Sequence, residues 1–252
     1  MIGLVTFFGH NLSVGDLIIF YIVAMLVGMA KTGVQGAGLL SVPLLAIVFG
    51  GQSSTGILLP VLCVADMLGV AYYHRHADWT QLRRLFPWAA LGTLIGTVVG
   101  NVINDAAFKT IMAIAILGSV AMMVFMRNEK MRAPGPAAAR FVGVLGGFTS
   151  MVGNLAGPMM AVFFLFMQLP KLVFIGTSAW FFLALNFFKI PFHVFHWKTI
   201  NLNTFYMTLT AVPVVVAGAG LGVLIVRNLS ERFYRQFIIV MTILAAILML
   251  VL

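Results

Sequence analysis

Charged residues are scarce in this chain of 252 residues. Only 8% of the residues are Asp, Glu, Lys or Arg, 62% are hydrophobic, and the mean hydropathy is +1.09. A soluble globular domain carries roughly 25% charged residues, so this composition excludes one. Backbone groups in lipid must be hydrogen-bonded within their own segment. We therefore predict an all-α polytopic membrane protein.

Other chemical signals are also missing. Cys63 is the only cysteine, which excludes an internal disulfide and a cysteine metal cage. The sequence has no Gly-x-x-x-x-Gly-Lys-Ser/Thr loop for phosphates and no neighbouring carboxylates for acid–base work, so ATP drive and catalysis are unsupported. Residues 1–16 contain no Lys or Arg, so we expect an uncleaved first membrane segment rather than a removable signal peptide. No cofactor is expected.

The basic residues lie between the apolar runs. The formal net charge is +9, and Lys and Arg cluster near residues 75–84, 127–140 and 227–235. This spacing is typical of the positive-inside pattern of membrane proteins, not of a stripe that follows nucleic-acid phosphates. We expect an integral protein of the bacterial inner membrane that does not bind nucleic acid.

Two long uncharged runs are interrupted by glycine. Residues 32–65 carry no charge, and a straight helix of that length would extend about 51 Å, whereas the hydrocarbon core is only about 30 Å thick. The run must fold back, and the cluster from Gly33 to Gly38 is the predicted bend. A second run, 141–170, is broken at residues 153–158. Paired broken segments in two halves indicate a transporter's binding site.

The two halves of the chain look like copies. Three residues in or shortly before the first break recur around the second at one constant offset, Asn154 falls on Gln35, and Asn186 falls on Asp66; the three repeated pairs are Gly28 and Gly147, Ala37 and Ala156, and Gly38 and Gly157. We predict about 8–10 membrane-embedded helical segments in two homologous repeats, 1–130 and 140–252, joined by a linker at 131–139. The distribution of Lys and Arg favours inverted over parallel repeats.

Several of these segments resemble a known family. Residues Gly33 to Leu45 resemble the glycine-rich first motif of the sulfite exporter TauE/SafE family, and Gly153 to Pro158 resemble its degenerate second copy. The steps Asn186-Phe187-Phe188-Lys189 and His76-Ala77-Asp78-Trp79 are also similar to that family. The resemblance spans the whole chain. It implies secondary transport, out of or into the cell, of sulfite and other sulfur oxyanions, sulfonates or small organic acids.

The breaks offer chemistry that suits a small anion. A helix that starts inside the membrane presents free N–H groups and a positive dipole end, and glycines allow close approach of the backbone. The amides of Gln35 and Asn154 can donate to anion oxygens. Alternatively, the glycines serve only tight helix crossings. The predicted substrate-binding residues are Lys31, Gly33, Gln35, Gly36, Gly38, Gly153, Asn154, Gly157, Asn186 and Lys189.

Three charges fall where charge is costly. Lys31 either neutralises an anionic substrate or reaches the membrane surface from a helix end. Asp66 is predicted as the coupling residue of proton-linked transport, since burial disfavours a charged carboxylate; the alternative is a structural ion pair with Lys31. Lys189 precedes Pro191, where it is either a ligand contact or an interfacial anchor.

Two other functions stay open at this point. A transition-metal carrier would need three or four converging ligands, for which the candidates are four histidines in predicted membrane-edge loops near Trp79 and Trp197: His74, His76, His193 and His196. An intramembrane enzyme would need His193 or His196 to meet Ser178, about four helical turns away. We therefore predict a transporter of small anions, not an enzyme, without a resident metal.

Overall fold

The computed structural model describes residues 5–34, 37–104, 106–108, 110–111, 114, 118, 135–230, 232–234, 236 and 240. These residues are almost entirely helical, which confirms the predicted all-α class. Five of the described helices are long and apolar enough to cross a membrane: α1 (Val14–Lys31), α3 (Gly51–Tyr73), α4 (Trp79–Val102), α8 (Lys171–Pro191) and α9 (Leu202–Asn228).

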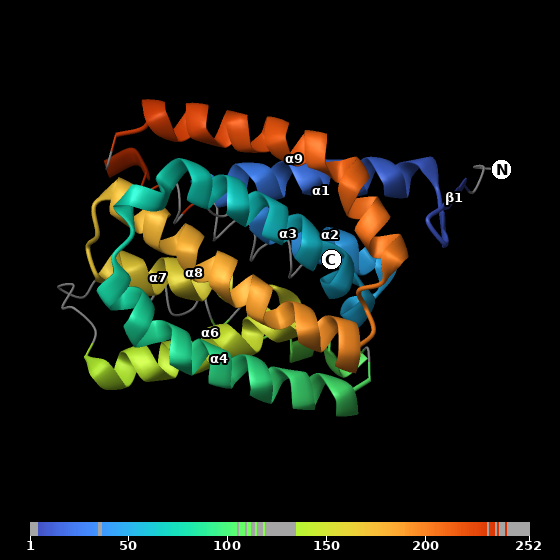
Figure 1. Ribbon diagram of the computed structural model, residues 1–252, viewed down its shortest axis with the longest axis horizontal. Coiled ribbons are helices and arrows are strands. Elements are labelled where there is room, and N and C mark those ends of the chain that lie inside the picture. Colours follow the sequence, from blue (N-terminus) through green and yellow to red (C-terminus); the bar gives the residue numbers. More distant parts are fainter. Residues whose placement is uncertain are drawn as a thin grey trace.

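Both glycine-rich breaks end a helix and begin a shorter one. α1 ends at Lys31, and a 3-10 turn, Ala37–Leu40, leads into α2 (Ser41–Phe49). In the second half α6 (Pro136–Gly153) is followed at once by α7 (Ala156–Phe166). α2 packs against α1, and α7 packs against α6, so each short helix turns back along its predecessor (Figure 1). The predicted broken helices are confirmed.

The first uncharged run contains a second turn that was not predicted. Gly50 has a φ of 85° and separates α2 from α3. This left-handed conformation favours glycine, because a Cβ would clash with the backbone. The run 32–65 is therefore folded twice, and α3 starts a new crossing at Gly51.

A small β-hairpin precedes α1 and was also not predicted. Strand β1 (Val5–Phe7) pairs antiparallel with β2 (His10–Leu12), and both turn residues, Phe8 and Gly9, have positive φ. α1 then starts with a capping box, in which Asp16 N donates to Ser13 Oγ at 3.1 Å and Ser13 N donates to Asp16 Oδ2 at 2.9 Å.

The first helix of each half packs against the fourth helix of the other half. α1 lies beside α9, α4 lies beside α6, and α3 crosses α8 between these pairs (Figure 1). Glycines make the close approach possible: Gly28 has no room for a Cβ beside the carbonyl of Val215, and Gly147 has none beside the carbonyl of Ala89. The two halves are therefore interlocked rather than side by side.

The contacts of the two helix pairs correspond position by position. Gly218 packs on the carbonyl of Met25 in the α1–α9 pair, and Gly92 packs on the carbonyl of Val144 in the α4–α6 pair. Gly28 is equivalent to Gly147, and Met25 to Val144, because both pairs are separated by 119 residues (28 to 147, 25 to 144). Gly92 and Gly218 are separated by 126 residues (92 to 218). Equivalent residues of the two halves thus make equivalent contacts.

Equivalent helices at the centre run in opposite directions. In the α3–α8 pair, Gly69 packs near Ala179, and Tyr73, later on α3, packs against Gly176, earlier on α8. α3 and α8 are therefore antiparallel. An inverted duplication requires this relation between the third helices of its two halves.

Candidate functional site

Asp66 is completely buried on α3 and meets residues from two other helices. Its Oδ1 lies 2.9 Å from Nζ of Lys31, the last residue of α1. Its Oδ2 accepts a hydrogen bond from Asn186 Nδ2 on α8, at 2.5 Å. The ammonium of Lys31 also lies 4.0 Å from the centre of the Phe182 ring, a cation–π contact. We refer to Lys31, Asp66 and Asn186 as the paired cluster.

The paired cluster resolves one of the sequence alternatives. The side chain of Lys31 is only 14% exposed and points to a carboxylate, so the interpretation as a lysine that reaches the membrane surface is wrong. The C-terminal end of a helix favours a cation, and Asp66 supplies the opposite charge. The ion pair joins α1 to α3, and the Asn186 amide ties both to α8.

Lys189 forms a second cluster without a carboxylate. It is completely buried, and its Nζ donates to Ser150 O at 3.1 Å, to Ser150 Oγ at 3.0 Å and to Asn154 Oδ1 at 2.6 Å. The carboxylate of Asp66 is paired with Lys31, not with Lys189. Of the two alternatives for Lys189, the interfacial anchor is therefore wrong, since the side chain is completely buried. We refer to Lys189, Ser150 and Asn154 as the unpaired cluster.

Asn154 is held in place by the break itself. It ends α6 in a left-handed conformation, with a φ of 56°, and its backbone N–H donates to Ser150 O at 2.9 Å. Its Nδ2 donates to the carbonyl of Thr55 on α3, at 3.2 Å. The Asn154 amide therefore links α6, α8 and α3. One of the two Nδ2 hydrogens is therefore directed at protein backbone here, and the predicted contact of Asn154 with an anion stays a prediction.

His193 lies one helical turn beyond Lys189 and is also completely buried. Its Nδ1 is 2.8 Å from Thr199 Oγ1, and its Nε2 has no hydrogen-bond partner in the described ranges. The prediction that His193 belongs to a membrane-edge loop is wrong. Trp197 is likewise only 7% exposed, and its indole N–H donates to Thr97 O at 3.1 Å, whereas Trp79 is half exposed.

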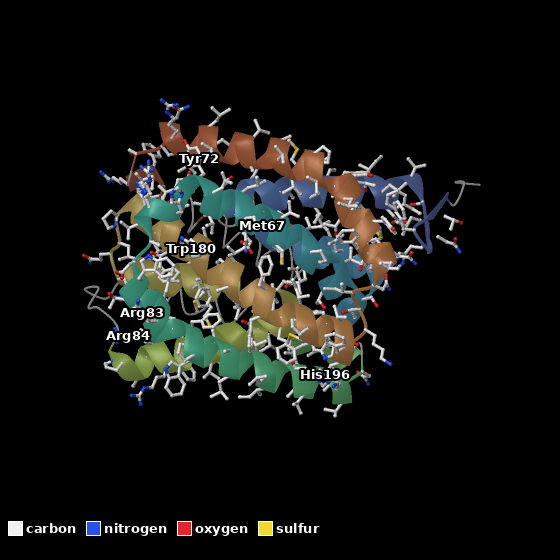
Figure 2. All side chains as sticks on the ribbon, in the orientation of Figure 1. Met67, Tyr72, Arg83, Arg84, Trp180 and His196 are labelled. Atoms are coloured by element: carbon white, nitrogen blue, oxygen red, sulfur yellow. The ribbon has the colours of Figure 1, made fainter. Side chains whose placement is uncertain are left out.

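The four candidate histidines do not converge on one site. His74 and His76 follow α3 in a 3-10 turn that packs against Gly176, at the start of α8. His193 and His196 follow α8 at its other end, and Figure 2 shows His196 opposite Tyr72. No group of three or more His, Cys, Asp or Glu residues that could hold a metal ion occurs among the described residues.

Of the glycines predicted to bind substrate, two pack against neighbouring side chains and two lie where α6 ends and α7 begins. Gly33 has a φ of 125° and faces Val226, and a Cβ on Gly38 would lie 3.0 Å from Ala30 Cβ, so both contact neighbouring side chains. Gly153 is buried in the last turn of α6, and Gly157 lies in the first turn of α7. Gln35 and Gly36 lie outside the described residues.

Ser150 is the site residue that sequence reasoning missed. It follows Lys31 by 119 residues (31 to 150), the offset that relates Gly28 to Gly147, so the repeat itself could have identified it. Lys189 follows Gly69 by 120 residues (69 to 189), which is also the separation between Asp66 and Asn186. Lys189 is therefore equivalent to Gly69, not to Lys31. The two lysines therefore occupy different positions of the repeat.

The two clusters together suit an anion. Asn186, which donates to Asp66, and Lys189 lie three residues apart on α8 (186 to 189), so the two clusters lie on one face of that helix. α7 starts two residues after Asn154, and no described side chain caps it, so the N–H groups of Ala156 and Gly157 lie uncapped close to the partner of Lys189; the third residue, Pro158, has no N–H. A buried cation beside an uncapped helix start is an arrangement that binds negatively charged groups.

Comparison with known proteins agrees with this chemistry. The family model of the sulfite exporter TauE/SafE matches residues 19–249, a range that includes both breaks and both lysine clusters. No individual curated protein and no solved structure matches the chain. Proteins of this family are membrane transporters of sulfite and sulfur anions rather than enzymes. On a match of this extent, the chain belongs to the sulfite exporter TauE/SafE family.

Proposed function

We propose that this protein is a secondary transporter that carries a small anion across the bacterial inner membrane. The substrate class is sulfite and other sulfur oxyanions, sulfonates or small organic acids. The observation that carries the proposal is the unpaired cluster: Lys189 is fully buried, and among the described residues its hydrogen bonds go only to neutral oxygens. A charge within the membrane costs at least about 2.5 kcal/mol, and cations retained there mark ion pathways. A bound anion supplies the missing opposite charge.

The anion's contacts follow from the geometry of the break. Lys189 donates a hydrogen bond to the anion in place of one of its present acceptors. The N–H groups around Gly157, at the positive N-terminal end of α7, also attract the anion. Ser150 Oγ can accept from Lys189 and can also donate to an anion oxygen, because a hydroxyl does both. Asn154 positions the ammonium through its Oδ1.

Asp66 is the proposed coupling residue. Both of its oxygens are occupied, one by Lys31 and one by Asn186. A proton on Asp66 removes its negative charge and weakens its hold on Lys31, which then becomes available to the anion. Proton and anion are thereby carried together. The equivalent position of the second half already has an amide, Asn186, which is the neutral analogue of a protonated acid.

The antiparallel relation of α3 and α8 supports alternating access by two inverted halves. It also supports an orientation, because cations gather at one end of the bundle, where Figure 2 shows Arg83 and Arg84. By the positive-inside rule that end faces the cytoplasm, and Lys198 lies at the other end. The described cations of the cytoplasmic end are Arg75, Arg83, Arg84, Arg140, Lys171, Arg227 and Arg232.

A ligand panel tests the proposed function. Purified protein in detergent is heated with sulfite, thiosulfate, methanesulfonate, acetate, Zn²⁺ or Mn²⁺, and unfolding is followed. A ligand at 100 times its Kd stabilises the folded state by about 2.7 kcal/mol, so an anion that binds raises the Tm. Counterflow of the same labelled anion into proteoliposomes then shows transport. Stabilisation by the divalent metals alone would contradict the proposal and favour a metal carrier.

A further inference from the structure

We infer that the turns that follow the two central helices are the gates of transport, one at each face of the membrane. The inference rests on the proposed function and adds how access to the two clusters is controlled. The inner turn is residues 74–78, after α3, and the outer turn is residues 192–200, after α8. Figure 2 shows Tyr72, just before the inner turn, and His196, in the outer turn, at opposite ends of the bundle.

The inner turn lies directly on α8. A Cβ at Gly176 would be 2.8 Å from the carbonyl oxygen of Tyr73 and 3.1 Å from Cβ of His76, so glycine is what leaves room for the turn. Asp78 N donates to Thr177 Oγ1 at 2.9 Å. The turn is therefore fastened over the beginning of α8.

The outer turn lies on α3 in the same way. Gly56 is equivalent to Gly176, because the two are separated by 120 residues (56 to 176), the offset between equivalent residues of the central helices. A Cβ at Gly56 would be 2.6 Å from the carbonyl oxygen of Thr199. The side chain of Thr199 is held by His193, whose Nδ1 lies 2.8 Å from its Oγ1. His193 is in turn the equivalent of Tyr73 (73 to 193).

Both clusters lie between these two contacts. Asp66 follows Gly56 by ten residues (56 to 66), about 15 Å of helix, and precedes Tyr73 by seven (66 to 73), about 10 Å. Lys189 precedes His193 by four residues (189 to 193). Asp66 and Lys189 are completely buried, so with both turns closed neither face of the membrane reaches them. Equivalent contacts at opposite ends are what alternating access by inverted repeats requires.

Each turn departs from α-helical geometry where it leaves its helix. His74–His76 is a 3-10 helix, whereas Phe192–His196 is a π-helix that follows Pro191. Lys198 in the outer turn has a φ of 53°. Such irregular segments and left-handed residues are frequent at hinges and switch regions. They are the positions at which a turn can move while α3 or α8 stays intact.

Cys63 is a natural reporter of access. It is the only cysteine of the chain, it is buried on α3, and it precedes Asp66 by three residues (63 to 66), which places both on one face of the helix. Sulfonatoethyl methanethiosulfonate, a membrane-impermeant thiol reagent, is added to right-side-out or inside-out vesicles, and the rate of modification of Cys63 is measured. Wild type should react slowly from both sides, and Cys63→Ser gives the background.

Two variants loosen each turn. Thr177→Val and Trp180→Phe remove hydrogen bonds of the inner turn, and Thr199→Val and Trp197→Phe remove contacts of the outer turn. One hydrogen bond changes an equilibrium about fivefold, so labelling should rise by about that factor from the cytoplasmic side in the first pair and from the other side in the second. Thr210→Val removes a hydrogen bond within α9 and should change neither rate. Thermal unfolding identifies any variant that does not fold, and the second variant of that turn then decides.

The sidedness of labelling decides between a gate and a merely structural turn. Faster labelling from both sides in the folded variants, or from neither, overturns the inference. Faster labelling from opposite sides, but with the two sides exchanged, supports the gates and contradicts the proposed orientation. The labelling contains no substrate, so the anion proposal is tested separately. Failure of every anion of the ligand panel to bind contradicts the proposed function, whatever the labelling shows.

Discussion

The paired and unpaired clusters occupy equivalent crossings of the two halves but solve the problem of a buried cation differently. In the first half Lys31 ends α1 and Gly69 on α3 packs against its carbonyl. In the second half the equivalents are Ser150 on α6 and Lys189 on α8, and the lysine donates to the Ser150 carbonyl. Both halves have the same backbone crossing, but the lysine lies on the first helix, α1, in one half and on the third helix, α8, in the other.

This difference is the basis for proposing that the substrate binds at the unpaired cluster. Lys31 has its counter-charge within the protein, and Lys189 does not. Removing one member of a buried pair costs several kcal/mol, whereas a lone buried cation is retained only where something else neutralises it. We therefore propose the unpaired cluster, rather than the paired one, as the place where the substrate binds.

The largest effect should follow from Lys189→Met. Methionine fills a similar volume and removes the uncompensated charge, so anion binding should fall by at least about 100-fold while the Tm stays level or rises. Anion-induced stabilisation and proteoliposome counterflow measure the two properties. Lys198→Met is the matched control, because Lys198 is exposed at the non-cytoplasmic end in our orientation. Retained binding in Lys189→Met would place the substrate elsewhere.

Asp66→Asn should act mainly on stability and on coupling. It leaves Lys31 buried and unpaired, which costs about 3–5 kcal/mol, and adding Lys31→Met should restore most of that loss. Thermal unfolding of the single and double variants gives the comparison. In proteoliposomes the single variant should still exchange anions but lose drive by a pH gradient. An unchanged pH dependence in Asp66→Asn would exclude Asp66 as the coupling residue.

Alanine substitutions at equivalent glycines of the two halves should lower the stability by similar amounts. Alanine at Gly28 or at Gly147 places a methyl group against a backbone carbonyl of the neighbouring helix, so each should destabilise the protein by about 1–3 kcal/mol. Gly220→Ala is the control, since a Cβ at Gly220 on α9 has open space. Thermal unfolding measures all three. A large effect in only one half would mean that the equivalence of the two packings is superficial.

The smallest effect is expected from Asn154→Gly. Glycine keeps the left-handed end of α6 but removes the hydrogen bonds to Lys189 and Thr55, a loss of about 1–2 kcal/mol in stability, together with weaker anion binding. Gln168→Gly is a control at another residue with positive φ, at 51°. Equal stability and anion affinity in wild type and Asn154→Gly would show that this amide does not position Lys189.

Local features of the site were partly readable from the sequence. The glycine clusters predicted both helix breaks, because glycine and proline interrupt helices and the uncharged runs exceed one crossing. Asp66, Lys31 and Lys189 stood out because charge is rare in so apolar a chain. The second turn at Gly50 was missed, since a single glycine pair gives no sign of its φ, and Ser150 was missed because serine is unremarkable in a membrane helix.

The amino-acid sequence by itself determined the all-α membrane class, the two breaks and the family, because hydropathy and glycine punctuation act locally along the chain. Only the tertiary structure decided which charges meet. Lys31 is 35 residues from Asp66 (31 to 66), and Asn186 is 120 residues from it. Partners that far apart are chosen by the interlocked packing of α1, α3, α6 and α8, in which burial removes water and makes each charge depend on its neighbours.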